Sequence, residues 1–316
     1  SSRFTGSFDG NGYSITGLKI NTSKVSCVGL FGCTEGATIK NVTLENVDIT
    51  GTVYTGYTGG LVGEADKSTI TNSYATGQVK GGTRTGGLVG QTVNSSITNS
   101  YATVKVTGIS DVGGLVGYTG SNTTITNSYA TGSVTGTGSN TGGLVGTAST
   151  SSTIKNSYAT GSVTGAVDYT GGLVGFAGSS TIENSYATGE VSGRGERTGG
   201  LVGLANYSTE ITNSYATGRV SGRAYTGGLV GRTNSSTEIT NSYATGRVTG
   251  RDHTGGLVGR ASGSISNSYA TGSVTGTSYT GGLVGSDDGS TVTNSYWDKD
   301  TTDQTKSAGG SGKSTE

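Results

Sequence analysis

The chain has 316 residues, 20 basic and 20 acidic side chains, and a hydrophobic content of only 30%. A formal net charge of zero provides no general attraction for nucleic acid, and the sequence has no run of 18 or more apolar residues that would span a membrane. Glycine contributes 61 residues, whereas proline and methionine are absent, so we expect regular backbone with many tight corners and a thin core.

Residues 1–50 are predicted to form an N-terminal capping region and a degenerate first coil. They contain three of the four phenylalanines and a hairpin signal at Asp9-Gly10-Asn11-Gly12. The start at Ser1, without a methionine or a signal peptide, is typical of a processed or excised fragment. Cys27 and Cys33 flank VGLFG and are either two small buried residues or one disulfide, which would indicate an oxidising compartment.

Residues 51–297 repeat one unit of about 28 residues. GGLVG occurs nine times, and successive copies lie 26 to 29 residues apart. Each unit reads T-G-G-L-V-G, a variable loop, T-I-T-N and S-Y-A-T-G-x-V-T-G, which is typical of short strands broken by glycine. Because so short a unit cannot bury its own apolar face, the copies must stack. The predicted fold is all-β, a right-handed parallel β-solenoid (β-helix) of about ten coils.

Exchangeable residues identify the side of each strand that faces water. The residue before the valine of x-V-T-G varies freely, so the alternation of strand side chains places Ala130 and Val134 inside and Tyr129 outside. The same reasoning places Ile125 and Asn127 inside, with a corner between Asn127 and Ala130. We therefore predict an inward, hydrogen-bonded asparagine ladder. It comprises Asn72, Asn99, Asn127, Asn156, Asn184, Asn213, Asn241, Asn267 and Asn294.

Residues 298–316 are predicted to form a C-terminal cap and a flexible tail. Trp297, the only tryptophan, precedes them, and the segment from Thr301 onward is rich in Ser, Gly and Lys. Asp298, Asp300 and Asp303 are candidate calcium ligands, although the spacing of an EF-hand is absent and a solvated turn is the alternative. No other metal and no cofactor is expected, since two cysteines and one histidine are too few for a usual zinc site.

The GGLVG core resembles the GLUG repeat (Gly-Leu-hydrophobic-Gly) of bacterial surface and adhesin-type proteins and immunoglobulin A metallopeptidases. The opening FTGSFDGNGYSITGL and the closing SYWDKDTTDQTKSAGGSGK also look like segments that begin and end such arrays, so the resemblance spans about residues 4–313. This resemblance implies a non-catalytic repeat region of a longer protein. The HExxH motif of a metallopeptidase is absent.

Catalysis is not expected. His253 is the only histidine and lies in a variable column before T-G-G, where no nucleophile–base arrangement can be built around it. A polysaccharide lyase or glycosidase would need acidic groups that converge on one face. The acidic residues are instead predicted to be scattered over several columns: Asp111, Asp168, Glu183, Glu190, Glu210, Glu238 and Asp252.

The outward tyrosines predict a surface contact ladder with a spacing of about 4.8 Å. Such a face could stack on sugar rings, order water as ice-binding solenoids do, or pack against another chain; alternatively, Tyr and Thr are simply good strand formers. The ladder consists of Tyr74, Tyr101, Tyr129, Tyr158, Tyr186, Tyr215, Tyr243 and Tyr269.

Arginines are concentrated in the C-terminal half, where stacked like charges repel and an anionic partner such as an acidic polysaccharide is one explanation. The alternative is that the side chains extend into water beside glutamates. The two predicted columns are Arg194, Arg223 and Arg251, and Arg219 with Arg247. Four glycosylation sequons, at Asn94, Asn122, Asn206 and Asn234, lie in the loop after GGLVG.

The sequence therefore predicts a non-enzymatic, extracellular or cell-surface structural and adhesive module, a stiff rod of an adhesin or surface fibre. The alternatives are a subunit of an end-to-end filament and a glycan-binding module; ice binding and polysaccharide lyase activity are less favoured. The expected partners are further copies of the chain, end to end or laterally, and an extracellular glycan or host surface. Neither nucleic acid nor a membrane span is expected.

Overall fold

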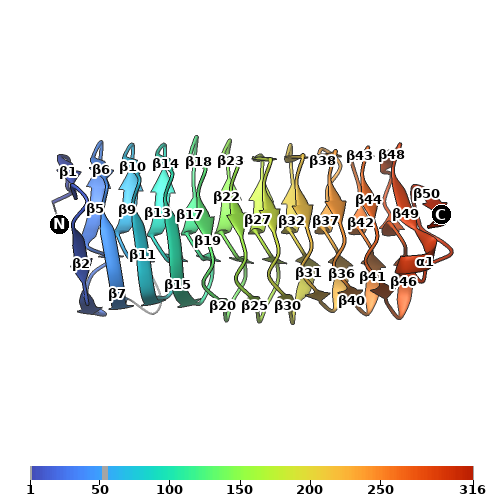
Figure 1. Cartoon of the computed structure of the whole chain (residues 1–316), viewed down its shortest axis with the longest axis horizontal. Coiled ribbons are helices and arrows are strands. Elements are labelled where there is room, and N and C mark those ends of the chain that lie inside the picture. The colour runs from blue at the N-terminus through green and yellow to red at the C-terminus, as the bar shows by residue number, and fades with distance from the viewer. Residues whose placement is uncertain (1, 52–55, 316) are drawn as a thin grey trace.

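The computed structural model describes residues 2–51 and 56–315, and these form a parallel β-solenoid whose coils stack along one axis (Figure 1). Residues 1, 52–55 and 316, which belong to the predicted N-terminal region, the start of the repeats and the tail, lie outside the described residues. The pairings between the described strands are parallel, and those within the repeats join one coil to the next, so that identical positions of successive repeats lie side by side. The predicted fold class is confirmed.

Four sheets run along the axis in the described part of the chain. Sheet 1 contains β1 (Ser7–Asp9), β6 (Thr38–Lys40), β10 (Thr69–Thr71), β14 (Ser96–Thr98), β18 (Thr124–Thr126), β23 (Thr153–Lys155), β28 (Thr181–Glu183), β33 (Glu210–Thr212), β38 (Glu238–Thr240), β43 (Ser264–Ser266) and β48 (Thr291–Thr293). Sheet 2 begins with β2 (Ser14–Thr16), β3 (Lys19–Asn21), β7 (Thr43–Thr50), β11 (Tyr74–Lys80) and β15 (Tyr101–Gly108).

After β15, sheet 2 divides into two rows. A Cβ at Gly132 would lie 1.9 Å from the Val104 carbonyl oxygen, so glycine allows the close approach that interrupts the strand here. The first row contains β19 (Tyr129–Ala130), β24 (Tyr158–Ala159), β29 (Tyr186–Ala187), β34 (Tyr215–Ala216), β39 (Tyr243–Ala244), β44 (Tyr269–Ala270), β49 (Tyr296–Asp298) and β50 (Ser311–Lys313). The second row contains β20 (Val134–Gly136), β25 (Val163–Gly165), β30 (Val191–Gly193), β35 (Val220–Ser221), β40 (Val248–Thr249) and β45 (Val274–Thr275).

Sheets 3 and 4 hold the strands on either side of Gly-Gly-Leu. Sheet 3 contains β4 (Cys27–Val28), β8 (Tyr57–Thr58), β12 (Thr85–Gly86), β16 (Val112–Gly113), β21 (Thr141–Gly142), β26 (Thr170–Gly171), β31 (Glu196–Gly199), β36 (Ala224–Gly227), β41 (Asp252–Gly255) and β46 (Ser278–Gly281). Sheet 4 contains β5 (Phe31–Glu35), β9 (Val62–Asp66), β13 (Val89–Val93), β17 (Val116–Thr119), β22 (Val145–Ser149), β27 (Val174–Gly178), β32 (Val202–Asn206), β37 (Val230–Thr233), β42 (Val258–Ala261) and β47 (Val284–Asp287).

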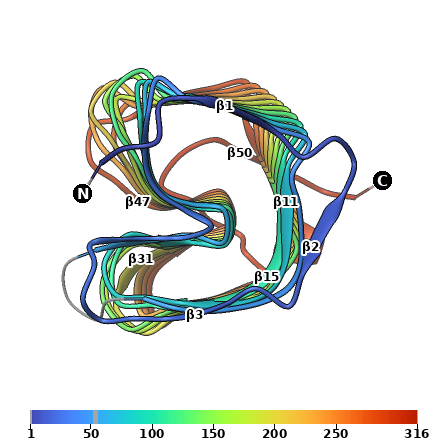
Figure 2. The same cartoon turned by 90° about the vertical axis from the view of Figure 1, so that its left-hand side faces the viewer.

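Between sheets 3 and 4 each coil folds inward toward the axis, as Figure 2 shows between β31 and β47. Leu144, at the tip of one such inward loop, is completely buried. A Cβ at Gly142 would lie 2.0 Å from the Val145 carbonyl oxygen, and one at Gly143 would lie 2.0 Å from the Gly172 carbonyl oxygen. The Gly-Gly of the repeat is therefore required by the close approach of backbone to backbone.

The corner between sheets 1 and 2 differs from the prediction. Asn127 has a left-handed backbone (φ 50°) and is exposed, while Ser128 beside it is buried. The asparagines still form a ladder on the outside, where Asn127 Nδ2 donates to Asn99 Oδ1 at 3.3 Å. Inside the corner the serines form a ladder, in which Ser128 N donates to Ser157 Oγ at 3.2 Å. The predicted inward position of the asparagines was wrong, because the left-handed residue itself turns the chain and shifts the alternation there.

Both ends of the solenoid also differ from the sequence expectations. The segment Asp9–Gly12 is a corner rather than a hairpin, since β1 lies in sheet 1 and β2 in sheet 2. The predicted flexible tail is folded: α1 (Lys299–Thr302) follows Trp297, and β50 pairs with β49. Gly282 N donates to Lys306 O at 3.0 Å, so this segment crosses the end of the last coil (Figure 2). Among the residues described, no helix is long and apolar enough to cross a bilayer.

Candidate interaction surfaces

The tyrosines of the first row of sheet 2 form one continuous stack. Neighbouring rings from Tyr74 to Tyr269 lie 4.5 to 5.0 Å apart between centroids and within 7° of parallel. Most of these side chains are half-buried, and Tyr269 is 42% exposed. Because each inner ring has a tyrosine against both faces, the stack presents ring edges and hydroxyl groups outward rather than ring faces. This geometry does not suit stacking on a sugar ring.

The pKa values of several tyrosine hydroxyl groups in this stack are raised. Burial raises the pKa of the Tyr129 hydroxyl above its usual value, and repulsion from an ionised Tyr158 raises it further. The pKa values of Tyr101, Tyr186 and Tyr215 are raised by the same causes. Each of these hydroxyl groups can both donate and accept a hydrogen bond while it is protonated.

A second surface was not predicted from the sequence and is named here the seam. It is formed by two facing columns at the mouth of the inward loops, with partners seven residues apart. The sheet 3 column is Tyr57, Arg84, Asp111, Asn140, Tyr169, Arg197, Tyr225, His253 and Tyr279, and the sheet 4 column is Glu64, Gln91, Tyr118, Thr147, Phe176, Leu204, Arg232, Arg260 and Ser286. From Arg84 to Tyr279 every residue of the sheet 3 column has a left-handed backbone, with φ between 50° and 64°. Bulky residues rarely adopt this conformation.

Polar contacts connect the N-terminal half of the seam. Gln91 Nε2 donates to Glu64 Oε1 at 3.1 Å, and the Arg84 guanidinium donates to Gln91 Oε1. Arg84 also lies 3.8 Å from the Asp111 carboxylate and over the ring of Tyr118, 4.4 Å from its centroid. The polar side chains of this half of the seam therefore bind to one another through hydrogen bonds and an ion pair.

Aromatic stacking dominates the C-terminal half. The His253 ring lies between Tyr225 and Tyr279, with centroid distances of 4.9 and 4.6 Å, and His253 Nδ1 is 2.7 Å from Ser286 Oγ. Burial, followed by the positive charge of Arg260, lowers the pKa of His253 below its usual value. The imidazole therefore packs between two tyrosine rings, and the Ser286 hydroxyl is its polar neighbour.

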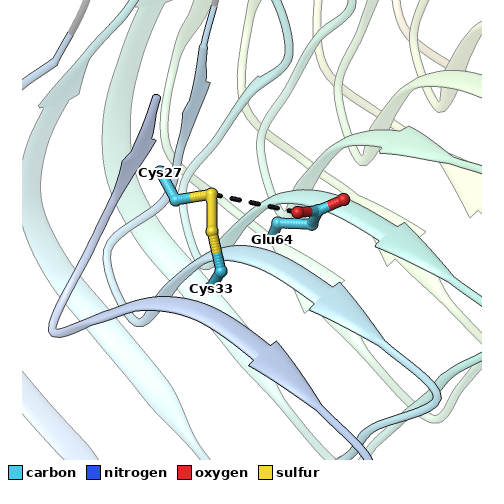
Figure 3. Close-up of side chains that lie close together, drawn as sticks. All are labelled: Cys27, Cys33 and Glu64. Atoms are coloured by element: carbon cyan, nitrogen blue, oxygen red, sulfur yellow. Dashed lines mark hydrogen bonds between the residues drawn. A yellow bond between two sulfur atoms is a disulfide. The ribbon is translucent and has the colours of Figure 1, made fainter. Parts of the chain in front are cut away.

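Cys27 and Cys33 form a disulfide between β4 and β5, with Cα atoms 5.6 Å apart (Figure 3). Glu64 completes a group of three potential metal ligands in the described residues. The bonded sulfurs are not thiolates, however, and are poor metal ligands. The 3.9 Å approach of Glu64 Oε2 to Cys27 Sγ is a packing contact, because a disulfide sulfur carries no hydrogen to donate.

The candidate calcium ligands serve the C-terminal cap. Asp298 Oδ1 accepts the Asp300 amide hydrogen at 2.9 Å, and Asp300 Oδ2 accepts the Thr315 amide hydrogen at 2.8 Å. The hydrogen bond from Thr315, with those from the backbone, lowers the pKa of Asp298. Within residues 2–51 and 56–315, Asp298, Asp300 and Asp303 do not bring three ligand oxygens together.

The other acidic residues lie on different sheets. Glu183, Glu210 and Glu238 belong to sheet 1, where Lys155 is 3.0 Å from Glu183. Asp111 lies in the seam, while Asp168 and Asp252 lie at the edge of sheet 3. Asp168 and Asp252 line the same recess, together with Glu196.

The two predicted arginine columns occupy different surfaces. Arg219 and Arg247 precede the paired valines of β35 and β40 and are exposed, and Arg247 Nε donates to Ser273 Oγ at 3.1 Å. Arg223 and Arg251 lie in adjacent loops before sheet 3, where Arg251 N donates to Arg223 O at 2.7 Å. Arg194 instead donates its amide hydrogen to Gly165 in the preceding coil.

Comparison with known proteins agrees with the repeat structure. The family model described as "The GLUG motif" matches residues 54–80, 81–107, 108–135, 137–164, 168–192, 195–221, 222–249 and 250–275, more than half of the chain. A similar curated protein is Halomucin of Haloquadratum walsbyi, which is 43% identical over 82 residues, 26% of this chain. The matched region is 1% of that relative's length. No solved structure matches the chain.

Proposed function

Because this chain belongs to the family of GLUG-motif proteins, we propose that it is a non-enzymatic structural module, a stiff rod of an extracellular or cell-surface protein. The observation that carries the proposal is the unbroken core: Leu144, Val145 and Ile154 of one coil are completely buried, and their counterparts in neighbouring coils are buried alike. Burial of each such side chain contributes about 1.5–3 kcal/mol, and each coil adds the same contribution, so length and stiffness increase together.

Two features support an extracellular location. The Cys27–Cys33 disulfide is stable in oxidising compartments. The partial similarity to halomucin is consistent with the same location. Labelling intact cells of the source organism with an impermeant amine reagent tests this proposal. Modification of the chain's lysines before lysis is expected, and labelling only after lysis would contradict an extracellular location.

An end-to-end filament is the alternative that we favour less. Donors of the last coil, which would pair with a following subunit, are already occupied, since Leu283 N and Val284 N donate to Ser307 Oγ at 3.2 and 2.8 Å. A row of open donors would promote stacking of subunits, and the cap occupies these donors and pairs β50 with β49. This favours a rod that ends at its cap.

A further inference from the structure

The loops that lead from sheet 2 into sheet 3 change length once in the C-terminal half. The loops at 137–140, 166–169 and 194–197 have four residues between the glycine of x-V-x-G and the threonine of T-G-G, whereas those at 223–225, 251–253 and 277–279 have three. The coils share one register on either side, as Thr198 pairs with Thr226. The additional residue therefore projects from the surface. The surface of the solenoid has a step where the four-residue loops give way to the three-residue loops.

A recess of about 650 Å³ lies at this step. The longer loops contribute Asp168, Glu196 and Arg197, and the shorter loops contribute Arg223, Ala224 and Arg251 with Asp252. A recess of this size accommodates one or two sugar units.

The three charged groups that the longer loops contribute to the recess, Asp168, Glu196 and Arg197, are already paired. Arg197 Nη1 lies 3.4 Å from both the Asp168 and the Glu196 carboxylates, and Asp168 Oδ1 accepts the Glu196 amide hydrogen at 2.9 Å. The Arg197 guanidinium also lies between the rings of Tyr169 and Tyr225, 5.2 and 5.5 Å from their centroids. This side of the recess is held rigidly before any ligand binds.

The two arginines on the shorter loops are free. Arg223 and Arg251 are exposed, and among the described residues neither forms an ion pair. They belong to adjacent coils, about 4.8 Å apart along the axis. Two guanidinium groups at this spacing can each bind one oxygen of the same anionic group. The carboxylate oxygens in the recess that are not paired with Arg197 can accept hydrogen bonds, and sugar hydroxyl groups can donate such bonds.

We propose that this recess binds an acidic saccharide unit, a uronate or a sulfated sugar, with the anionic group on Arg223 and Arg251 and the sugar hydroxyls on Asp168, Glu196 and Asp252. An acidic saccharide fits this mixture better than a simple anion does, because its hydroxyl groups can donate hydrogen bonds to the carboxylates while its anionic group binds the arginines. This inference goes beyond the structural role and does not depend on it. It also separates Arg223 and Arg251 from Arg219 and Arg247, which lie outside the recess.

Isothermal titration calorimetry of the purified chain with a uronate oligosaccharide, a sulfated oligosaccharide and a neutral oligosaccharide of equal length tests the proposal. Binding of either acidic oligosaccharide, but not the neutral one, is expected, and the one that binds identifies the anionic group. Absence of binding by both acidic oligosaccharides, or equal binding of the neutral one, would overturn the proposal.

Three variants locate the site. Arg223→Gln/Arg251→Gln should lower the association constant at least about tenfold, since it removes both charge-assisted contacts. Arg219→Gln/Arg247→Gln removes the same charge from the same two coils and should leave the constant within about twofold. Ala224→Trp should weaken binding by filling the recess without changing its charge. Equal losses in the two double variants would show general electrostatic attraction instead and would overturn the site.

Discussion

The rings of Tyr129 and Tyr158 lie 4.8 Å apart and within 3° of parallel, and Tyr158 has the same relationship to Tyr186. A tyrosine inside this stack therefore touches a tyrosine on each face. The stack lies in sheet 2 and spans most coils of the rod, so its first consequence is cohesion between coils rather than recognition of a ligand.

Replacement of one inner tyrosine should therefore destabilise the solenoid. Tyr158→Ala removes two ring contacts and should lower the free energy of unfolding by about 1–3 kcal/mol, measured by urea denaturation followed by circular dichroism. The control is Tyr207→Ala, whose ring is 63% exposed and outside the stack; a change below about 0.5 kcal/mol is expected. Equal effects of the two substitutions would contradict a cohesive role for the stack.

Replacement of the threonine of T-G-G by valine is expected to stabilise the solenoid or leave its stability unchanged, in contrast to replacement of an inner tyrosine. Thr170 is completely buried, and its hydroxyl has no hydrogen-bond partner among the described residues. Val112 occupies the corresponding position in another coil and pairs with Thr141 and Thr85. Because an unpaired buried hydroxyl costs about 1–3 kcal/mol, Thr170→Val should raise the thermal unfolding midpoint or leave it unchanged.

A matched threonine serves as the control for this experiment. Thr209 is equally buried, but its hydroxyl donates to Asn206 O at 2.6 Å and to Ala177 O at 3.1 Å. Thr209→Val should lower the midpoint, since both carbonyls lose a donor. If both valine variants destabilised the chain to the same extent, the distinction between paired and unpaired hydroxyls would be wrong.

The asparagine corner can be tested by comparing two substitutions at one site. Asn156 has φ 50° and donates to Asn127 Oδ1 at 3.2 Å. Asn156→Ala should cost about 1–2 kcal/mol, because alanine is strained in the left-handed region and loses the hydrogen bond. Asn156→Gly should cost less, because it loses the hydrogen bond without the strain. The difference in urea midpoint between the two variants measures the backbone contribution, and an alanine variant at least as stable as the glycine variant would contradict it.

The alternation of side chains between the inside and the outside predicts burial correctly only where the backbone is extended. The alternation predicts that Ala130, Val134 and Ile125 lie inside and Tyr129 outside, and the structure confirms these positions. The prediction was wrong at Asn127, because a residue with a left-handed backbone shifts the alternation by one residue. The tolerance of asparagine for this conformation was the signal in the sequence that could have located the corner.

The seam escaped prediction for a different reason. Residues such as Tyr169 and Arg84 lie in the column before T-G-G that varies from repeat to repeat, and variation alone does not reveal a packing partner. Their contacts are with the residue seven positions later, across the inward loop, as for Tyr169 with Phe176 at 5.9 Å. Comparison of positions within one column cannot reveal this pairing. Correlated variation of two columns at a seven-residue separation would have indicated it.

The seam also predicts a dependence of stability on pH. Since the pKa of His253 is lowered by folding, the unfolded chain, in which a histidine titrates near 6.5, binds the proton more readily. The contribution of His253 to the free energy of unfolding is therefore fully present above pH 6.5, and it is lost as the pH falls through the lower pKa of the folded state. His253→Tyr, which matches Tyr225 and Tyr279, should reduce the decline of the thermal midpoint between about pH 7.5 and about pH 5.5. An unchanged decline would contradict this origin, since His253 is the only histidine of the chain.

Small-angle X-ray scattering of the purified chain over a range of concentrations distinguishes a single capped rod of stacked coils from an end-to-end filament. We expect a monomer of 31.3 kDa whose axial length of roughly 50 Å, from the spacing of paired strands, does not change with concentration. A particle that lengthens with concentration would contradict the capped rod and favour a filament. The scattering profile of an expanded chain would contradict the solenoid itself.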